Sequence, residues 1–143
     1  MRRIGFLTAG AVLLGLASLA SAQPTAFTQE QRAQGEALVR KAAQSIASTA
    51  REPSSVSFRH VFIQKRIAED GREPITLCGE VNGKNGFGGF TGYQAFILIG
   101  DTVHVGRAVG FDVGYLCRNR NPIVDTRDYS PEMKAAFDAA VGF

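Results

Sequence analysis

Residues 93–109 read YQAFILIGDTVHVGRAV, and this stretch decides the fold that we expect. The apolar run at 95–99 is continuous, which is typical of a strand buried on both faces. Gly100-Asp101 is a two-residue signal for a hairpin turn. A second strand follows over residues 102–109. The stretch therefore predicts two neighbouring antiparallel strands joined by a tight turn.

Three further segments have the period of strands. Residues 56–67 alternate, and we expect one face to hold Val56, Phe58, His60 and Phe62 and the other face to hold Ser57, Arg59, Val61 and Ile63. Residues 75–82 alternate in the same way. Residues 111–117 are expected to add a last strand, and a polar loop is expected over 118–129. Sequential strands with short turns favour an antiparallel meander.

A helix is expected on each side of these strands. Thr28 and Gln31 have the spacing of a capping box, and the helix should run to about Ala50 with a face made mostly of alanine. Ser130 as a cap, followed by Pro131, should begin a short last helix. The sequence thus predicts an α+β fold, with the N-terminal helix packed on a four- or five-stranded antiparallel meander and a short C-terminal helix.

Residues 1–22 have the layout of a secretory signal peptide. Arg2-Arg3 supplies positive charge, an apolar stretch follows, and 20–22 read Ala-Ser-Ala. The apolar stretch is shorter than the roughly 20 residues that a spanning helix needs. We expect cleavage near Ala22, a periplasmic or secreted location, no stable membrane anchor after cleavage, and a single α+β domain over 23–143.

Cleavage also changes the charge. The chain has 16 Lys and Arg against 13 Asp and Glu, and loss of Arg2 and Arg3 leaves 14 against 13, so the net charge falls from +3 to +1. A nearly balanced protein gives no reason to expect nucleic acid as a partner.

Cys78 and Cys117 are the only cysteines. In an oxidising compartment an even count favours a disulfide, here between a mid-sheet strand and the last strand. Two buried free thiols are the alternative. The spacing of Cys and His residues does not suit zinc, and no metal or other cofactor is expected.

Residues 78–93 read CGEVNGKNGFGGFTGY, with six glycines in sixteen residues. Such a density indicates unusual backbone angles, close approach or mobility. We take the candidate binding residues from this segment: Asn82, Lys84, Asn85, Phe87, Phe90 and Tyr93. Backbone amides beside the lysine could hold an anion, and the aromatic rings could form an apolar or stacking surface. The alternative is a long hairpin connection whose aromatic rings pack into the core.

Three stretches carry a resemblance to known sequences: EPSSVSFR at 52–59, CGEVNGKN at 78–85 and FGGFTGYQAF at 87–96. They resemble a group of small exported proteobacterial and phage-borne proteins, which is itself uncharacterised. That group usually has Asp where this chain has Glu52, and often Tyr where it has Phe90. The resemblance implies export and brings no activity with it.

Catalytic groups are sparse. The only histidines, His60 and His104, lie on expected strands, and Gly-x-Ser-x-Gly is absent. Glu80 and Asp112 would form a carboxylate pair only if their strands adjoin. No catalytic residue is therefore expected.

We expect an exported non-catalytic binding or interaction module of the cell envelope. Its loop at 82–93 would contact an envelope protein or a glycan. An inhibitor of a secreted hydrolase is the alternative, and a weak enzyme acting on envelope polymers through Glu80 is a further one. Edge strands of a short meander can also pair between copies, which leaves a dimer open.

Overall fold

A computed structural model describes residues 27–65, 69–108, 110–118 and 123–143. The expected signal peptide and the start of the mature chain lie outside these residues. Within them, no helix is both long and apolar enough to cross a membrane.

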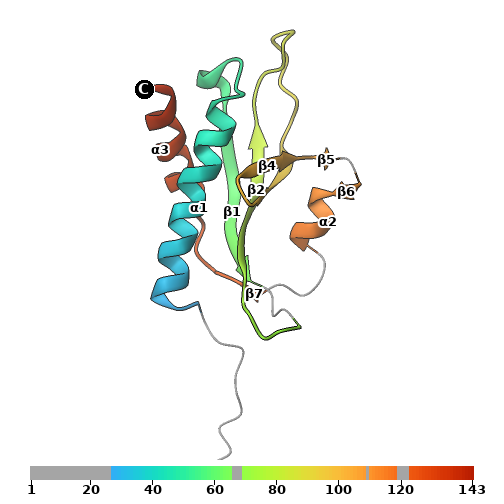
Figure 1. The fold of residues 1–143 in the computed structure, drawn as a ribbon. Coiled ribbons are helices and arrows are strands. Elements are labelled where there is room, and N and C mark those ends of the chain that lie inside the picture. The colour runs from blue at the N-terminus through green and yellow to red at the C-terminus, as the bar shows by residue number, and fades with distance from the viewer. Residues whose placement is uncertain (1–26, 66–68, 109, 119–122) are drawn as a thin grey trace, which may run out of the picture.

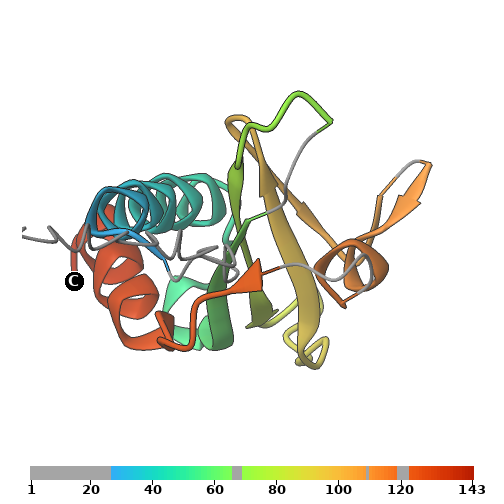
Figure 2. The same cartoon turned by 90° about the horizontal axis from the view of Figure 1, so that it is seen from below.

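Three layers make up the fold. Helices α1 (Gln29–Ala47) and α3 (Ser130–Val141) cover one face of an antiparallel sheet, and the shorter α2 (Val113–Arg118) lies against the other face. Figure 2 shows the layers end on, with the sheet between them. The α+β class that the sequence predicts is confirmed.

The main sheet has the strand order β4-β3-β2-β1-β7. Its first four strands form the predicted antiparallel meander, with the bounds β1 (Ser57–Lys65), β2 (Ile75–Asn82), β3 (Gln94–Ile99) and β4 (Thr102–Val105). Ile99 pairs with Thr102, which confirms the tight turn between β3 and β4. Phe96, Ile97 and Leu98 are buried, so β3 is covered on both faces as predicted.

The prediction of a strand over residues 111–117 is correct for the first two residues and wrong for the rest. Two short strands, β5 (Arg107–Ala108) and β6 (Phe111–Asp112), form a separate hairpin, and α2 follows at once. The reason is a helix cap, because Asp112 Oδ1 accepts the backbone N–H of Tyr115 at 3.0 Å. The fifth strand of the main sheet is β7 (Ile123–Val124), which lies in the stretch expected to be a loop and pairs with β1.

The start of α1 agrees with its predicted capping box. Thr28 Oγ1 accepts the Gln31 N–H, and Gln31 Oε1 accepts the Thr28 N–H, both at 3.1 Å. The helix ends at Ala47, before the expected Ala50. It packs closely on the sheet, since a Cβ placed on Gly35 would lie 2.7 Å from Ile63 Cδ1.

A β-bulge interrupts β1 between Arg59 and Phe62. His60 lies in it with φ at 51°, an uncommon angle for a residue other than glycine. At the bulge Val61 is not paired with a residue of β2. Its backbone forms hydrogen bonds with the start of α3 instead. Val61 N–H donates to Ser130 Oγ at 3.1 Å, and Val61 C=O accepts from Tyr129 N–H at 2.8 Å.

The bulge overturns the faces predicted for β1. One extra residue reverses the alternation of side chains that follow it. Val61 and Ile63 therefore join Phe58 in the core beneath α1 and α3, whereas Phe62 packs on the α2 side with Cys78.

Ser130 has a different role from the predicted helix cap. It is the first residue of α3, and its side chain donates to Asp128 Oδ1 at 2.6 Å while it accepts from β1. The prediction of a serine cap is wrong because this hydroxyl joins the helix to the bulge instead.

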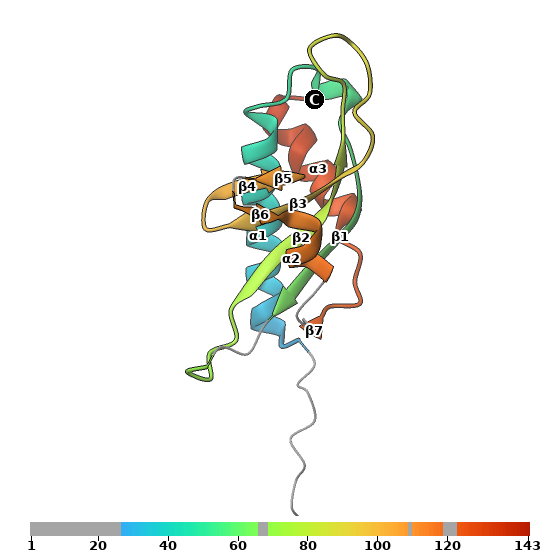
Figure 3. The same ribbon diagram turned by 90° about the vertical axis from the view of Figure 1, so that its right-hand side faces the viewer.

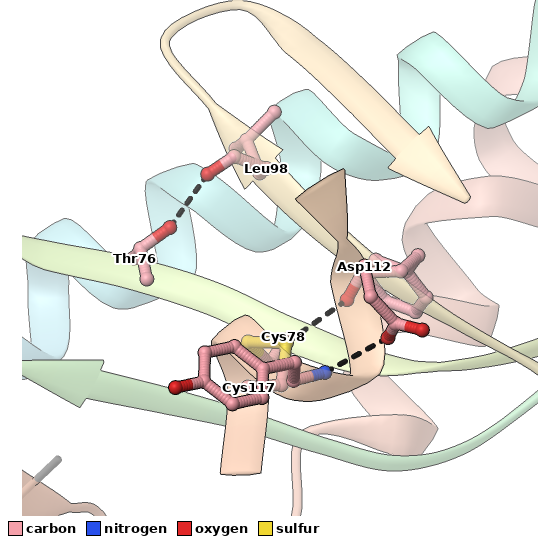
Figure 4. The surroundings of a disulfide bond; sticks show 7 residues. Thr76, Cys78, Leu98, Asp112 and Cys117 are labelled. Carbon is pink, nitrogen blue, oxygen red and sulfur yellow. Dashed lines mark hydrogen bonds between the residues drawn. A yellow bond between two sulfur atoms is a disulfide. The ribbon is translucent and has the colours of Figure 1, made fainter. Parts of the chain in front are cut away.

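Figure 4 shows the disulfide between Cys78 and Cys117, which confirms the predicted pairing. It links β2 to α2, so the expectation that Cys117 lies on a strand is wrong. Both cysteines are buried, and the sequence separation is 39 residues. In the chain-entropy account a loop of this size stabilises the fold by about 4 kcal/mol.

Candidate functional site

The glycine-rich loop, residues 83–93, extends the β2–β3 hairpin well past the end of the sheet (Figures 1 and 3). Lys84 and Phe90 form an isolated antiparallel bridge, and Thr91 N–H donates to Gly83 C=O at 3.2 Å. The two arms of the loop are thus paired beyond the strands, and a tight turn closes the tip.

Asn85 organises this tip. Its Oδ1 accepts the backbone N–H of Phe87 at 2.9 Å and that of Gly89 at 3.1 Å. Its own N–H donates to Gly89 C=O at 2.8 Å, and its C=O accepts from Gly88 N–H at 3.1 Å. Gly88 has φ at 80°, an angle that glycine adopts without steric cost. Four hydrogen bonds at one residue therefore define the shape of the tip.

The aromatic rings of the loop lie outside the core. Phe87 is 99% exposed, Phe90 is 61% exposed and Tyr93 is 38% exposed. These values contradict the alternative that the rings pack into the core. The loop is an aromatic projection with a defined backbone.

The segment at 51–55 supports the base of the loop. Lys84 N–H donates to Ser55 Oγ at 3.0 Å, and Lys84 Nζ donates to Glu52 Oε1 at 2.8 Å. Arg51 lies against the loop, since its Nη1 is 3.2 Å from a Cβ placed on Gly86. Sequence reasoning did not choose these supporting residues, although most of them belong to the EPSSVSFR stretch of the resemblance.

The polar part of the predicted site lines a cavity. A cavity of about 350 Å³ opens between the end of α1 and the base of the loop, and its lining includes three of the six candidate residues: Asn82, Lys84 and Asn85. The structure therefore divides the predicted set into a polar group at this cavity and an aromatic group on the outer surface.

The anion contact that the sequence suggested has competing partners within the loop. The N–H groups of Phe87 and Gly89 already donate to Asn85, and the ammonium of Lys84 already pairs with Glu52. These three groups are therefore engaged within the protein, while the aromatic rings of the loop are exposed.

Tyr93 lies at the foot of the loop among charged groups of β1 and β2. The Arg59 guanidinium is 3.9 Å from the centroid of the Tyr93 ring, and the Tyr93 hydroxyl is 3.1 Å from Ser57 Oγ. Arg59 also donates to Glu80 Oε2 at 2.5 Å, and His60 Nδ1 is 3.2 Å from the same oxygen. One face of this ring is thus covered by an arginine.

Glu80 is poorly suited to act as an acid. The hydrogen bond from Arg59 lowers its pKa below the ordinary value of 4.5, while partial burial opposes that effect and His60 reinforces it. The carboxyl group is therefore ionised at neutral pH. The hypothesised pair with Asp112 is not among the described contacts, where Asp112 Oδ2 lies 3.7 Å from Arg107 Nε.

Comparison with protein-family models, with curated proteins and with solved structures found no match. In the ranges that the structure describes, no three His, Cys, Asp or Glu side chains cluster as a metal site would require. The functional proposal is therefore based on the geometry of the glycine-rich loop.

Proposed function

We propose that the chain is an exported, non-catalytic binding module of the cell envelope and that the glycine-rich loop is its contact surface. The observation that carries this proposal is Phe87, whose side chain is 99% exposed at the tip of an ordered loop. Exposed apolar surface in a soluble protein often marks an interaction site, and aromatic side chains supply much of the energy of interfaces.

The loop suits insertion into a pocket of a partner protein. Five backbone N–H groups of the loop donate within it: those of Asn85, Phe87, Gly88, Gly89 and Thr91. Burial of the tip in a partner would therefore leave these five donors satisfied. A loop already held in one shape also loses less conformational entropy on binding. Burial of the Phe87 ring alone would then contribute about 1.5–3 kcal/mol.

A protein partner is favoured over a glycan. Stacking on sugars needs an open aromatic face together with free polar groups nearby. Arg59 covers one face of Tyr93, and the polar side chains of Lys84 and Asn85 are engaged within the protein. The most exposed ring, that of Phe87, has no polar group of its own. These features favour an apolar pocket as the partner surface.

A secreted hydrolase is a specific candidate for this partner, which would make the module an inhibitor. The loop is a projecting hairpin, and Arg51 lies beside it at Gly86. Hydrolases that cleave glycosides carry paired carboxylates in their clefts. An apolar tip flanked by a guanidinium would complement such a cleft in shape and charge.

The test is capture of the partner in intact cells with a photo-cross-linking phenylalanine analogue at position 87. The matched control places the same analogue at Phe143, which is also exposed and belongs to the C-terminus. We expect one protein to be captured at position 87 and not at 143, and to bind the purified wild-type module but not Phe87→Ala. Equal capture at both positions, or equal binding by both purified proteins, would contradict the proposal.

A further inference from the structure

Two Asn-Gly pairs lie three residues apart on the same hairpin, Asn82-Gly83 and Asn85-Gly86. A glycine after asparagine leaves the next backbone nitrogen unhindered by a Cβ. That nitrogen can then approach the side-chain amide carbon of the asparagine. The two pairs share a sequence and differ in structure, which makes each a control for the other.

We propose that Asn85-Gly86 is a site of spontaneous modification that converts Asn85 to aspartate and isoaspartate. The Gly86 backbone nitrogen gives its proton to solvent base and attacks Asn85 Cγ. The new N–Cγ bond closes a succinimide ring, and the side-chain nitrogen leaves as ammonia. Water then opens the ring at either carbonyl, so that the products are aspartate and isoaspartate. No oxidant, reductant or enzyme is required.

The environment of Asn85 favours the attack. Asn85 is exposed, so solvent base and water reach it. Its Oδ1 already accepts two backbone N–H groups, at 2.9 and 3.1 Å. Negative charge develops on this oxygen when Cγ is attacked, and two preorganised donors stabilise such charge as an oxyanion hole does. Among the hydrogen bonds of the described residues, the Gly86 N–H makes none that would have to break.

The environment of Asn82 opposes the same reaction. Asn82 is the last residue of β2 and pairs with Ser57 of β1, so its backbone is held extended by the sheet. Its Oδ1 is buried and has no hydrogen-bond donor. Thr91 N–H and Thr91 Oγ1 both donate to Gly83 C=O, which restrains the peptide that follows. We therefore expect modification to be confined to the second pair.

Isoaspartate at position 85 would dismantle the tip. The main chain would then run through the former side chain and gain a methylene group. The paired bonds of residue 85 with Gly88 and Gly89 require the ordinary backbone spacing. Aspartate would keep that spacing and a side-chain acceptor. The consequence for partner binding rests on the proposed function, whereas the chemistry does not.

The experiment follows the intact mature protein during incubation in mildly alkaline buffer. Peptide mapping by mass spectrometry and enzymatic isoaspartate methylation report conversion at each asparagine. We expect conversion at Asn85 to exceed that at Asn82 by about tenfold or more, which corresponds to about 1.4 kcal/mol in the barrier. In the reduced, denatured chain the two sites should convert at similar rates.

Gly86→Ala supplies the second variant. The added Cβ would meet Arg51 Nη1 at 3.2 Å, and this is the mobile end of a long side chain, so the variant should fold. We expect about tenfold slower conversion at Asn85, again about 1.4 kcal/mol. Equal rates at the two sites in the folded protein would overturn the proposal. An Asn85 that survives while the denatured chain converts would overturn it as well. Neither result needs the partner, so each leaves the proposed function standing.

Discussion

Asn85 holds the backbone of Phe87: its Oδ1 accepts the Phe87 N–H at 2.9 Å, while the Phe87 ring is 99% exposed. One residue therefore shapes the tip of the loop, and another residue presents the apolar surface. Substitution of Asn85 should change the order of the loop tip, and substitution of Phe87 should change the contact with a partner. The two effects can therefore be measured separately.

Phe87→Ala should weaken partner binding without loss of stability. If the ring is buried in the complex, its burial contributes about 1.5–3 kcal/mol to binding. Removal of the ring should therefore raise the Kd by roughly 10- to 100-fold. The free energy of unfolding should change by less than about 0.5 kcal/mol, because the ring is exposed in the free protein. Calorimetric titration and urea denaturation measure the two quantities. Phe143→Ala is the matched control, and an equal loss of affinity in it would remove Phe87 as the anchor.

Asn85→Ala should loosen the tip while the ring at position 87 remains. The variant loses the acceptor for the Phe87 and Gly89 N–H groups. At about 1 kcal/mol for each hydrogen bond, exchange of these two amide hydrogens should become about fivefold faster. Hydrogen exchange followed by NMR measures this directly.

Asn85→Asp is the companion variant, because a carboxylate keeps the acceptor and the backbone spacing. Protection at Phe87 and Gly89 should be retained in it. If Asn85→Ala also retains full protection, the glycine backbone angles alone would shape the tip.

The meander was predictable because its signals are local. The tight turn at Gly100-Asp101 and the capping box at Thr28 each depend on residues close in sequence. The bulge at His60 was not predictable, since it depends on contacts between Val61 and the start of α3, about 70 residues away. The extra residue of this bulge reverses the faces of the second half of the strand.

The candidate site shows the same division. The glycine and aromatic spacing located the loop and its rings, because these are properties of the segment itself. Their exposure and the role of Asn85 required the hairpin geometry. The support from Arg51, Glu52 and Ser55 depends on a contact between two segments about 30 residues apart. Cys117 lies on a helix because Asp112 caps the start of that helix. The residue spacing around Asp112 resembles that of a strand, so the sequence pattern did not indicate the cap.

Loss of the disulfide should destabilise the fold strongly. The double substitution Cys78→Ala with Cys117→Ala frees a loop with a sequence separation of 39 residues. We expect the free energy of unfolding to fall by about 4 kcal/mol, as the chain-entropy account gives for a loop of this length. Urea denaturation measures the change. Wild-type protein in reducing agent should approach the stability of the double variant, and the variant should not respond to the reducing agent. This account would be contradicted if the free energy of unfolding of the wild type did not change after its disulfide had been shown to be reduced.

Glu80 should link stability to pH through its contact with Arg59. Because this contact lowers the pKa of the folded carboxyl below its ordinary value of 4.5, the folded state favours the ionised form. The stabilisation is present above that ordinary value and is lost as the pH falls through the lower folded pKa. Glu80→Gln should therefore be less stable than the wild type at neutral pH, and its stability should decline less on acidification.

Part of the decline should persist in Glu80→Gln, because Asp128 and Glu132 also have lowered pKa values, chiefly from hydrogen bonds with Ser130 and Arg127, respectively. Urea denaturation over a series of pH values checks this, with Arg59→Gln as the partner variant that removes the same contact. Parallel pH profiles for the wild type and Glu80→Gln would show that the Arg59 contact does not favour the ionised form.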